Sequence, residues 1–250
     1  MRWLTLHSMI SWRVGSVAGV SHVFLIGGGR DPEGAHAINA PFARAVLATG
    51  REDVALVVLD EGETTNAEER AEGLRLVGLS PEIHVVSPRK PPSGLGDAVA
   101  VYVTGGLTPG YQEALCPDPS WLPEDAIYGG FSAGAAIAAE VALVGGWRMD
   151  GVPVCGEDSG EDLDEIEIRP GLALVEPIVD VHCAQWGNLG RLAEVVRAGD
   201  GRAGWGLDEH TTLELRDGAP VAVHGEGAAW LVERLDGERV SVRPRFAGAL

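Results

Sequence analysis

The chain has little of what several common kinds of site require. Its 250 residues include only three cysteines, Cys116, Cys155 and Cys183. They are widely spaced and form no CxxC motif and no Cys/His pair, which argues against a disulfide framework and a structural zinc site. A GxxxxGK[ST] phosphate-binding loop is also missing. We therefore expect a protein of the reducing cytoplasm whose chemistry needs neither a metal nor a cofactor.

Basic residues are scarce as well. Lys and Arg number 19 against 37 Asp and Glu, so the formal net charge is -18 at pH 7, and the isoelectric point is about 4.7. Such a chain has nothing to offset phosphate repulsion, which excludes nucleic acid and anionic membranes as expected partners. No stretch of the sequence is long and apolar enough to span a membrane.

The first twenty residues differ from the rest. Ser8, Ser11 and Arg13 interrupt their apolar residues before a signal-peptide core of the usual length can form. We expect residues 1–20 to be an extension outside the fold. Residues 21–250 should form a single α/β domain, because 45% of the chain is hydrophobic and its length is rather short for two full domains. A homodimer is the candidate assembly.

From His22 onward, short β-branched runs alternate with helical patterns, which is typical of a doubly wound, mostly parallel sheet with flanking helices. A dense acidic run, 156–168, follows the first half, and we interpret it as a solvated loop or an edge hairpin. The predicted strands of the first half are 23–26, 54–59, 83–86, 98–103 and 126–129, and its predicted helices are 41–49 and 66–77. In the second half we predict strands at 172–175 and 178–181, a helix at 188–198, and a β-rich end with strands at 211–215, 219–223, 228–231 and 240–242.

Three glycines, 27–29, follow the first predicted strand. They do not complete a GxGxxG motif before a helix, because the run continues Arg30-Asp31-Pro32. We therefore predict a tight turn that lets loops crowd the carboxyl edge of the sheet, rather than a dinucleotide site.

The segment Gly130-Phe131-Ser132-Ala133-Gly134 stands between an apolar strand and an alanine-rich helix predicted over 135–141. This pattern indicates a nucleophile elbow, in which glycines flank a serine on a tight strand-to-helix turn because a Cβ there would collide with neighbouring backbone. The helix beginning under the serine would favour negative charge where an acyl-transfer intermediate carries it. The alternative is a glycine-rich turn with a serine N-cap.

A nucleophilic serine needs a base, usually a histidine, and that histidine needs an acid partner. Of the seven histidines, His182 stands out because it follows 178–181, at the carboxyl end of a predicted strand, where an open parallel sheet gathers its functional loops. Glu209, Asp208 and Asp150 are the candidate acids, and their spacing alone does not choose between them.

The order of these motifs resembles that of a known family. The chain carries Gly105-Gly106 after a strand, the elbow, Asp180-Val181-His182 followed by Gly190-Arg191-Leu192, and Gly206-Leu207-Asp208-Glu209. This order is similar to that of the cyanophycinase and aspartyl dipeptidase (peptidase E) family of serine peptidases. The resemblance covers roughly residues 23–231 and implies a fold similar to the class I glutamine amidotransferases.

The resemblance also implies roles for individual residues. It implies Ser132 as the nucleophile, His182 as the base and Glu209 as the acid. The backbone N–H groups of Gly106 and Ala133 would form the oxyanion hole. In the aspartyl dipeptidase branch an aspartate shortly after the elbow is the acid instead, which keeps Asp150 as a lesser candidate.

The chain departs from the cyanophycinase pattern around the expected site. Val181 stands in place of a glutamine, Trp186 and Asn188 in place of arginines, and Leu107 and Thr108 in place of an Asp and a Gln. A site built to pair charges tolerates their loss badly, so we do not expect the same β-linked substrate. Arg191, at a helix start, is either structural or binds a carboxylate. Trp186 and Leu107 would offer apolar contact area. The candidate substrate-binding residues are Asp180, Gln185, Trp186, Arg191 and Leu107.

The expected function is that of a serine peptidase that hydrolyses short peptides, as a dipeptidase or an aminopeptidase does, through an acyl-enzyme on Ser132. Two alternatives are a cyanophycinase-type β-aspartyl peptidase and a catalytically silent binding protein with the same fold. A glutaminase is disfavoured because that chemistry uses cysteine at the elbow. An esterase of the α/β-hydrolase type is disfavoured because its acid precedes its histidine in the chain.

Overall fold

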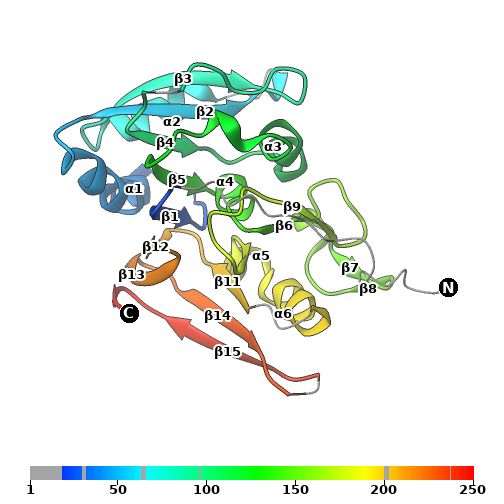
Figure 1. The fold of residues 1–250 in the computed structure, drawn as a ribbon. Coiled ribbons are helices and arrows are strands. Elements are labelled where there is room, and N and C mark those ends of the chain that lie inside the picture. Colours follow the sequence, from blue (N-terminus) through cyan, green and yellow to red (C-terminus); the bar gives the residue numbers. More distant parts are fainter. Residues whose placement is uncertain (1–18, 30–31, 63–65, 96, 200–202, 237) are drawn as a thin grey trace.

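A computed structural model describes residues 19–29, 32–62, 66–95, 97–199, 203–236 and 238–250. Its largest element is an eight-stranded sheet with the strand order β16-β13-β12-β1-β5-β4-β2-β3 (Figure 1). Five neighbouring strands are parallel: β1 (His22–Ile26), β5 (Ile127–Phe131), β4 (Ala100–Val103), β2 (Asp53–Leu59) and β3 (Ser80–Val86). An antiparallel edge follows with β12 (Thr211–Arg216), β13 (Ala219–Gly225) and β16 (Gly248–Ala249). The predicted α/β fold with a large, mostly parallel sheet is confirmed.

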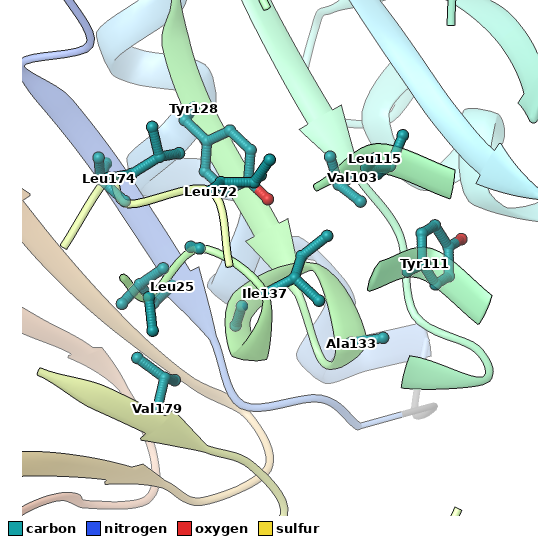
Figure 2. Close-up of a cluster of buried hydrophobic side chains, with 14 of the residues drawn as sticks. Leu25, Val103, Tyr111, Leu115, Tyr128, Ala133, Ile137, Leu172, Leu174 and Val179 are labelled. Atoms are coloured by element: carbon teal, nitrogen blue, oxygen red, sulfur yellow. The ribbon is translucent and has the colours of Figure 1, made fainter. Parts of the chain in front are cut away.

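Helices cover both faces of this sheet. Alternate residues of a strand point to opposite faces, so Phe24 and Ile26 of β1 pack toward one layer and Val23 and Leu25 toward the other. The first layer contains α1 (Pro32–Leu47) and α2 (Ala67–Arg75), and the second contains α3 (Thr108–Leu115) and the single turn α4 (Ala133–Ala136). Figure 2 shows the second layer, where Leu25, Tyr128 and Ile137 lie in one buried cluster. Burial on both faces explains why the inner strands β1, β2, β4 and β5 are almost continuously apolar in the sequence.

A second, four-stranded sheet adjoins the first and has the order β10-β11-β14-β15. Helix α6 (Leu189–Ala198) packs on it through Leu192, Val195 and Val196, which form a small core with Ile178 and Val232. The short helix α5 (Cys183–Trp186) lies between β10 and α6. The strands of this sheet are β10 (Ile178–Asp180), β11 (Ala203–Leu207), β14 (Ala229–Arg234) and β15 (Val240–Arg245).

Two small antiparallel pairs lie between α4 and β10 in the chain. They are β6 (Val141–Gly145) with β9 (Glu167–Pro170), and β7 (Arg148–Met149) with β8 (Val152–Pro153). The acidic run 156–168 spans the 3-10 turn Glu157–Ser159, the loop that leads to β9 and the start of that strand. None of the helices in the described residues combines the length and the apolar character that crossing a membrane would need.

Four sequence predictions need correction. The helix predicted over 41–49 is α1, which begins at Pro32 and ends at Leu47. The helix predicted over 135–141 ends at Ala136, and β6 already begins at Val141. The strand predicted over 172–175 is irregular, because Leu172 and Leu174 donate their N–H groups to carbonyls of residues 137 and 138 at the end of α4. The extension predicted over 1–20 lies mostly outside the described residues, but Val20 packs against the core and so belongs to the fold.

Candidate active site

Ser132 is held in an unusual backbone conformation where β5 meets α4. Its φ of 52° and ψ of -110° are uncommon for a residue with a side chain, and its N–H donates to the Ile26 carbonyl at 2.8 Å. A Cβ on Gly130 would lie 2.5 Å from the Gly134 carbonyl oxygen, and one on Gly134 would lie 2.3 Å from that of Val103. The two glycines are therefore required by close backbone approaches, as the elbow pattern predicts.

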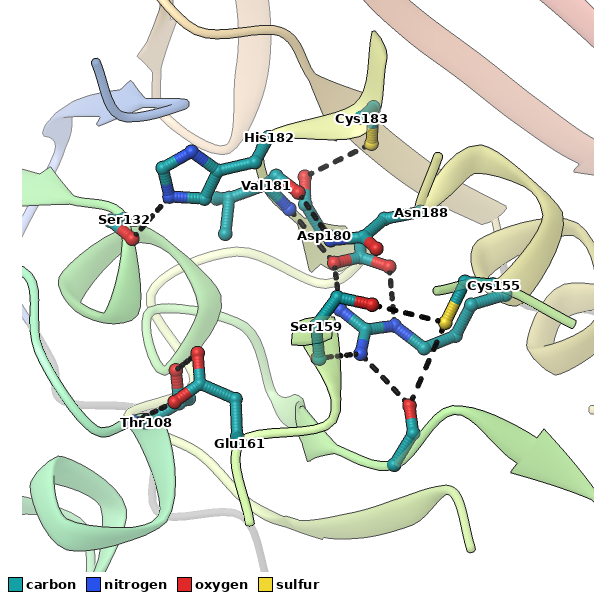
Figure 3. Close-up of polar contacts among 12 residues, drawn as sticks. Thr108, Ser132, Cys155, Ser159, Glu161, Asp180, Val181, His182, Cys183 and Asn188 are labelled. Atoms are coloured by element: carbon teal, nitrogen blue, oxygen red, sulfur yellow. Dashed lines mark hydrogen bonds and ion pairs between the residues drawn. The ribbon is translucent and has the colours of Figure 1, made fainter. Parts of the chain in front are cut away.

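His182 follows β10 and reaches Ser132 from the second sheet. Its own backbone is left-handed, with φ 54° and ψ 32°, and its N–H donates to the Gly27 carbonyl at 3.0 Å. The ring atom Nε2 lies 2.8 Å from Ser132 Oγ (Figure 3). On the other side of the ring, Nδ1 lies 2.7 Å from Glu209 Oε1. Because the residue is only 7% exposed, its ring is fixed between a hydroxyl and a carboxylate.

The three candidate acids have different surroundings. Glu209 contacts His182 directly. Asp208, next to it, is buried and accepts hydrogen bonds from the Ala184 and Ala228 N–H groups and from the Trp230 indole, so its carboxylate holds loops together. Asp150 lies in the exposed turn between β7 and β8. The structure therefore brings Ser132, His182 and Glu209 together and leaves the other two acids outside this contact.

The glycines at 27–29 make room for this arrangement. A Cβ on Gly27 would lie 2.1 Å from the Asp208 carbonyl oxygen, and one on Gly28 would lie 2.1 Å from His182 Cε1. Both distances are far shorter than any real Cβ contact. As predicted, the turn lets two loops crowd the carboxyl edge of the sheet.

The loop after β4 lies beside the serine. A Cβ on Gly105 would lie 2.9 Å from Ser132 Cβ, which places the first of the paired glycines against the elbow. Among the described residues, neither the Gly106 N–H nor the Ala133 N–H donates to a backbone carbonyl. The Glu61 carboxylate lies against Gly106, where a Cβ would be 2.7 Å from Glu61 Oε1. Since α4 has only four residues, its dipole is small, and stabilisation of negative charge near Ser132 depends on individual N–H groups rather than on the helix as a whole.

Two glutamates that were not identified from the sequence accept hydrogen bonds from residues at the start of α3. Glu61 Oε1 accepts from the Leu107 N–H at 2.7 Å. Glu161 accepts from the Thr108 N–H at 3.1 Å and from its hydroxyl at 3.2 Å (Figure 3). Burial raises the pKa of Glu161 above its ordinary value, although the Thr108 hydrogen bonds oppose the rise. Nothing in the sequence distinguishes Glu161 from the other acids of the 156–168 run, because only the folded loop turns it inward.

The raised pKa of Glu161 gives a prediction for stability. A carboxyl whose pKa is higher in the folded state contributes most stability at low pH and loses that contribution as the pH rises through the folded pKa. We therefore expect Glu161→Gln to raise Tm slightly at pH 8, and the gain to shrink toward pH 4. Thermal unfolding followed by circular dichroism would measure it. Glu157→Gln, at an exposed position of the same run, is the control, and an equal gain from both variants would contradict the prediction.

Asp180 and Arg191 bind each other rather than facing the serine. The Arg191 Nε and Nη2 atoms donate to the two carboxylate oxygens of Asp180 at 3.0 and 2.8 Å, and Nη1 donates to the Gly146 and Ser159 carbonyls. Both residues are buried: Asp180 is 2% exposed and Arg191 is 4% exposed. Burial opposes the charge of Arg191, but attraction to Asp180 outweighs it and holds the arginine pKa above its ordinary value. Arg191 thus binds a carboxylate of the protein itself, and we do not retain either residue as a substrate contact.

Of the other three candidate substrate contacts, two touch His182 or Glu209 and the third packs against the core. The Trp186 ring stacks on the His182 ring with centroids 4.0 Å apart and 7° between planes. Gln185 Oε1 accepts from the Glu209 N–H at 2.9 Å. Leu107 is partly buried and packs against the core of the second layer. In the described part of the chain, no three His, Cys, Asp or Glu side chains gather as metal ligands would.

Comparisons with known proteins place the fold. No family model matches the chain, and no curated protein matches it. The chain is similar to the crystal structure of a peptidase from an acI-B1 Actinobacterium, with a TM-score of 0.65 and 18% sequence identity. The match covers 92% of this chain and 96% of that chain. The likeness therefore shows a shared fold over nearly the whole of both chains.

Proposed function

We propose that this protein is a serine peptidase that hydrolyses short peptides through an acyl-enzyme on Ser132. The observation that carries the proposal is the unbroken chain of contacts from Ser132 Oγ to His182 Nε2 at 2.8 Å and from His182 Nδ1 to Glu209 Oε1 at 2.7 Å. A hydroxyl, an imidazole and a carboxylate in this order are what nucleophilic activation of serine requires.

The proposed reaction follows from this order of groups. Glu209 accepts a hydrogen bond from the Nδ1–H of His182 and so holds the proton on that nitrogen. Nε2 is then unprotonated and takes the Ser132 proton as Oγ attacks the peptide carbonyl. The imidazolium then donates this proton to the leaving amine, and the same histidine activates the water that hydrolyses the acyl-enzyme. The carboxylate stabilises the imidazolium between these steps.

The Gly106 and Ala133 N–H groups are the proposed oxyanion donors. Two features support this role: Gly105, next to Gly106, lies against Ser132, and neither N–H donates to a backbone carbonyl within the described residues. Removing one such donor typically costs about 10²–10³-fold in kcat. The fold shared with a peptidase of known structure also favours peptide hydrolysis.

The surroundings of the serine favour neutral or basic peptides over acidic ones. Arg191 is already paired with Asp180, so it offers no charge to a substrate carboxylate. Glu61 and Glu161 add carboxylates at the loop that carries Gly106. These features argue against the cyanophycinase-type alternative, in which a β-aspartyl-arginine dipeptide would be the substrate.

Two experiments test the proposal. A fluorophosphonate probe should label Ser132 in the wild-type protein, because an unactivated serine does not react, and the labelled residue would be identified by mass spectrometry. A panel of dipeptides and tripeptides, with α-aspartyl and β-aspartyl-arginine members, should then be hydrolysed, with the aspartyl members among the slowest.

Each negative result has a distinct meaning. No labelling of Ser132 would favour the silent binding protein. Labelling with fast turnover of p-nitrophenyl esters but none of any peptide would favour an esterase. Preferred cleavage of β-aspartyl-arginine would restore the cyanophycinase-type alternative.

A further inference from the structure

The indole of Trp186 lies flat on the imidazole of His182. The ring centroids are 4.0 Å apart and the planes differ by 7°, so the two rings overlap face to face. Trp186 belongs to none of the three buried hydrophobic clusters, and 43% of the residue is exposed. Core packing therefore does not explain a tryptophan at this position, whereas contact with His182 does.

The backbone around Trp186 fixes it in this place. Its N–H donates to the His182 carbonyl at 2.8 Å, which closes the single turn of α5. Gly187 then ends the turn in a left-handed conformation, with φ 75°. The indole and the imidazole are thus four residues apart on one turn, the spacing at which helical side chains meet.

The same turn also contacts the acid. Gln185 Oε1 accepts a hydrogen bond from the Glu209 N–H at 2.9 Å. The adjacent residues Gln185 and Trp186 of α5 therefore contact Glu209 and His182, respectively. Gly28 lies against His182 Cε1, where a Cβ would clash at 2.1 Å. Between Gly28 and Trp186 the imidazole has little room to rotate away from Ser132 and Glu209.

We propose that Trp186 is a positioning residue that holds the His182 ring in line with Ser132 and Glu209 and stabilises its protonated form. The inference rests on the proposed function. An indole face attracts a cation, and the imidazolium forms only after the serine has lost its proton. The contact with Trp186 is therefore stronger in the transition state than in the resting enzyme, which lowers the barrier of the chemical step.

A substitution of Trp186 distinguishes a positioning role from a substrate contact, because the two roles predict changes in different kinetic constants. A tryptophan that only binds substrate would affect KM and leave kcat unchanged. A positioning tryptophan would affect kcat, because small displacements of a reacting group cost up to about 10²-fold. Phenylalanine keeps an aromatic face, whereas leucine keeps apolar volume without one, so this pair of variants separates ring stacking from simple coverage.

The experiment compares Trp186→Leu and Trp186→Phe with the wild type. We expect Trp186→Leu to lower kcat and the rate of fluorophosphonate labelling by about tenfold with less than about a threefold change in KM. Trp186→Phe should recover most of both rates. Phe246→Leu, which changes an exposed aromatic residue beyond β15, is the control and should leave both rates unchanged.

A measurement that needs no catalysis completes the test. The ¹⁵N shifts of the His182 ring report whether its proton stays on Nδ1, opposite Glu209. We expect them to move in Trp186→Leu and to stay near the wild-type values in Trp186→Phe. Unchanged shifts and rates in Trp186→Leu, or a change in KM alone, would overturn the inference. If the wild-type Ser132 is not labelled, the proposed peptidase function fails, and the ¹⁵N shifts still decide whether Trp186 positions the ring.

Discussion

Replacing Ser132 with alanine is expected to lower kcat/KM for a good peptide substrate by about 10⁴-fold or more, and replacing His182 with alanine by a similar factor. The double variant should be no slower than either single one, because the hydroxyl and the imidazole act as one unit through their 2.8 Å contact. Initial rates at high enzyme concentration would measure the residual activity. Circular dichroism would show that the fold is kept.

The acid provides a matched control for this prediction. Glu209→Gln should lower kcat by about 10²–10⁴-fold, because an amide does not stabilise the imidazolium and favours the wrong tautomer. Asp150→Asn removes the competing candidate in an exposed turn and should leave kcat unchanged. Retention of more than about a tenth of the activity by Ser132→Ala, or losses that multiply in the double variant, would contradict the proposed mechanism.

The sequence predicted the elements of the central sheet well. Its inner strands β1, β2, β4 and β5 are buried on both faces. A continuous apolar run such as that of β2 is a local signal that needs no knowledge of the neighbouring strands. The elbow motif itself is local as well, because Gly130 and Gly134 lie within two residues of Ser132 and a Cβ on Gly130 would collide with Gly134. Such features follow from short stretches of chain.

Other features depend on contacts between distant segments and were not predictable in this way. The alanine-rich run after Ser132 has high helix propensity, but residues 171–175 bind its carbonyls and end the helix at Ala136. Choosing Glu209 over Asp208 from the residues alone would require knowing which of two adjacent carboxylates faces His182. Spacing along the chain carries no such information.

Separating Arg191 from Asp180 is expected to have the largest effect on stability. Arg191→Met should lower the free energy of unfolding by about 3–5 kcal/mol, because it leaves a buried carboxylate without a counterion. The Gly146 and Ser159 carbonyls would also lose their shared donor. Urea unfolding at pH 7, followed by tryptophan fluorescence, would measure the change.

A matched pair on the surface tests whether burial is the cause. Arg51 and Asp53 form an ion pair at 2.7 Å with both side chains about half exposed, and Arg51→Met should cost less than about 1 kcal/mol. Exchanging both buried partners, Asp180→Leu with Arg191→Met, should recover part of the loss, because no charge is then left unpaired. Equal losses from the two arginine variants would contradict the argument. His182 follows Asp180 by two residues, so the same pair fixes the strand end from which the proposed base reaches Ser132. Partial loss of the pair should therefore lower kcat even under conditions where the protein remains folded.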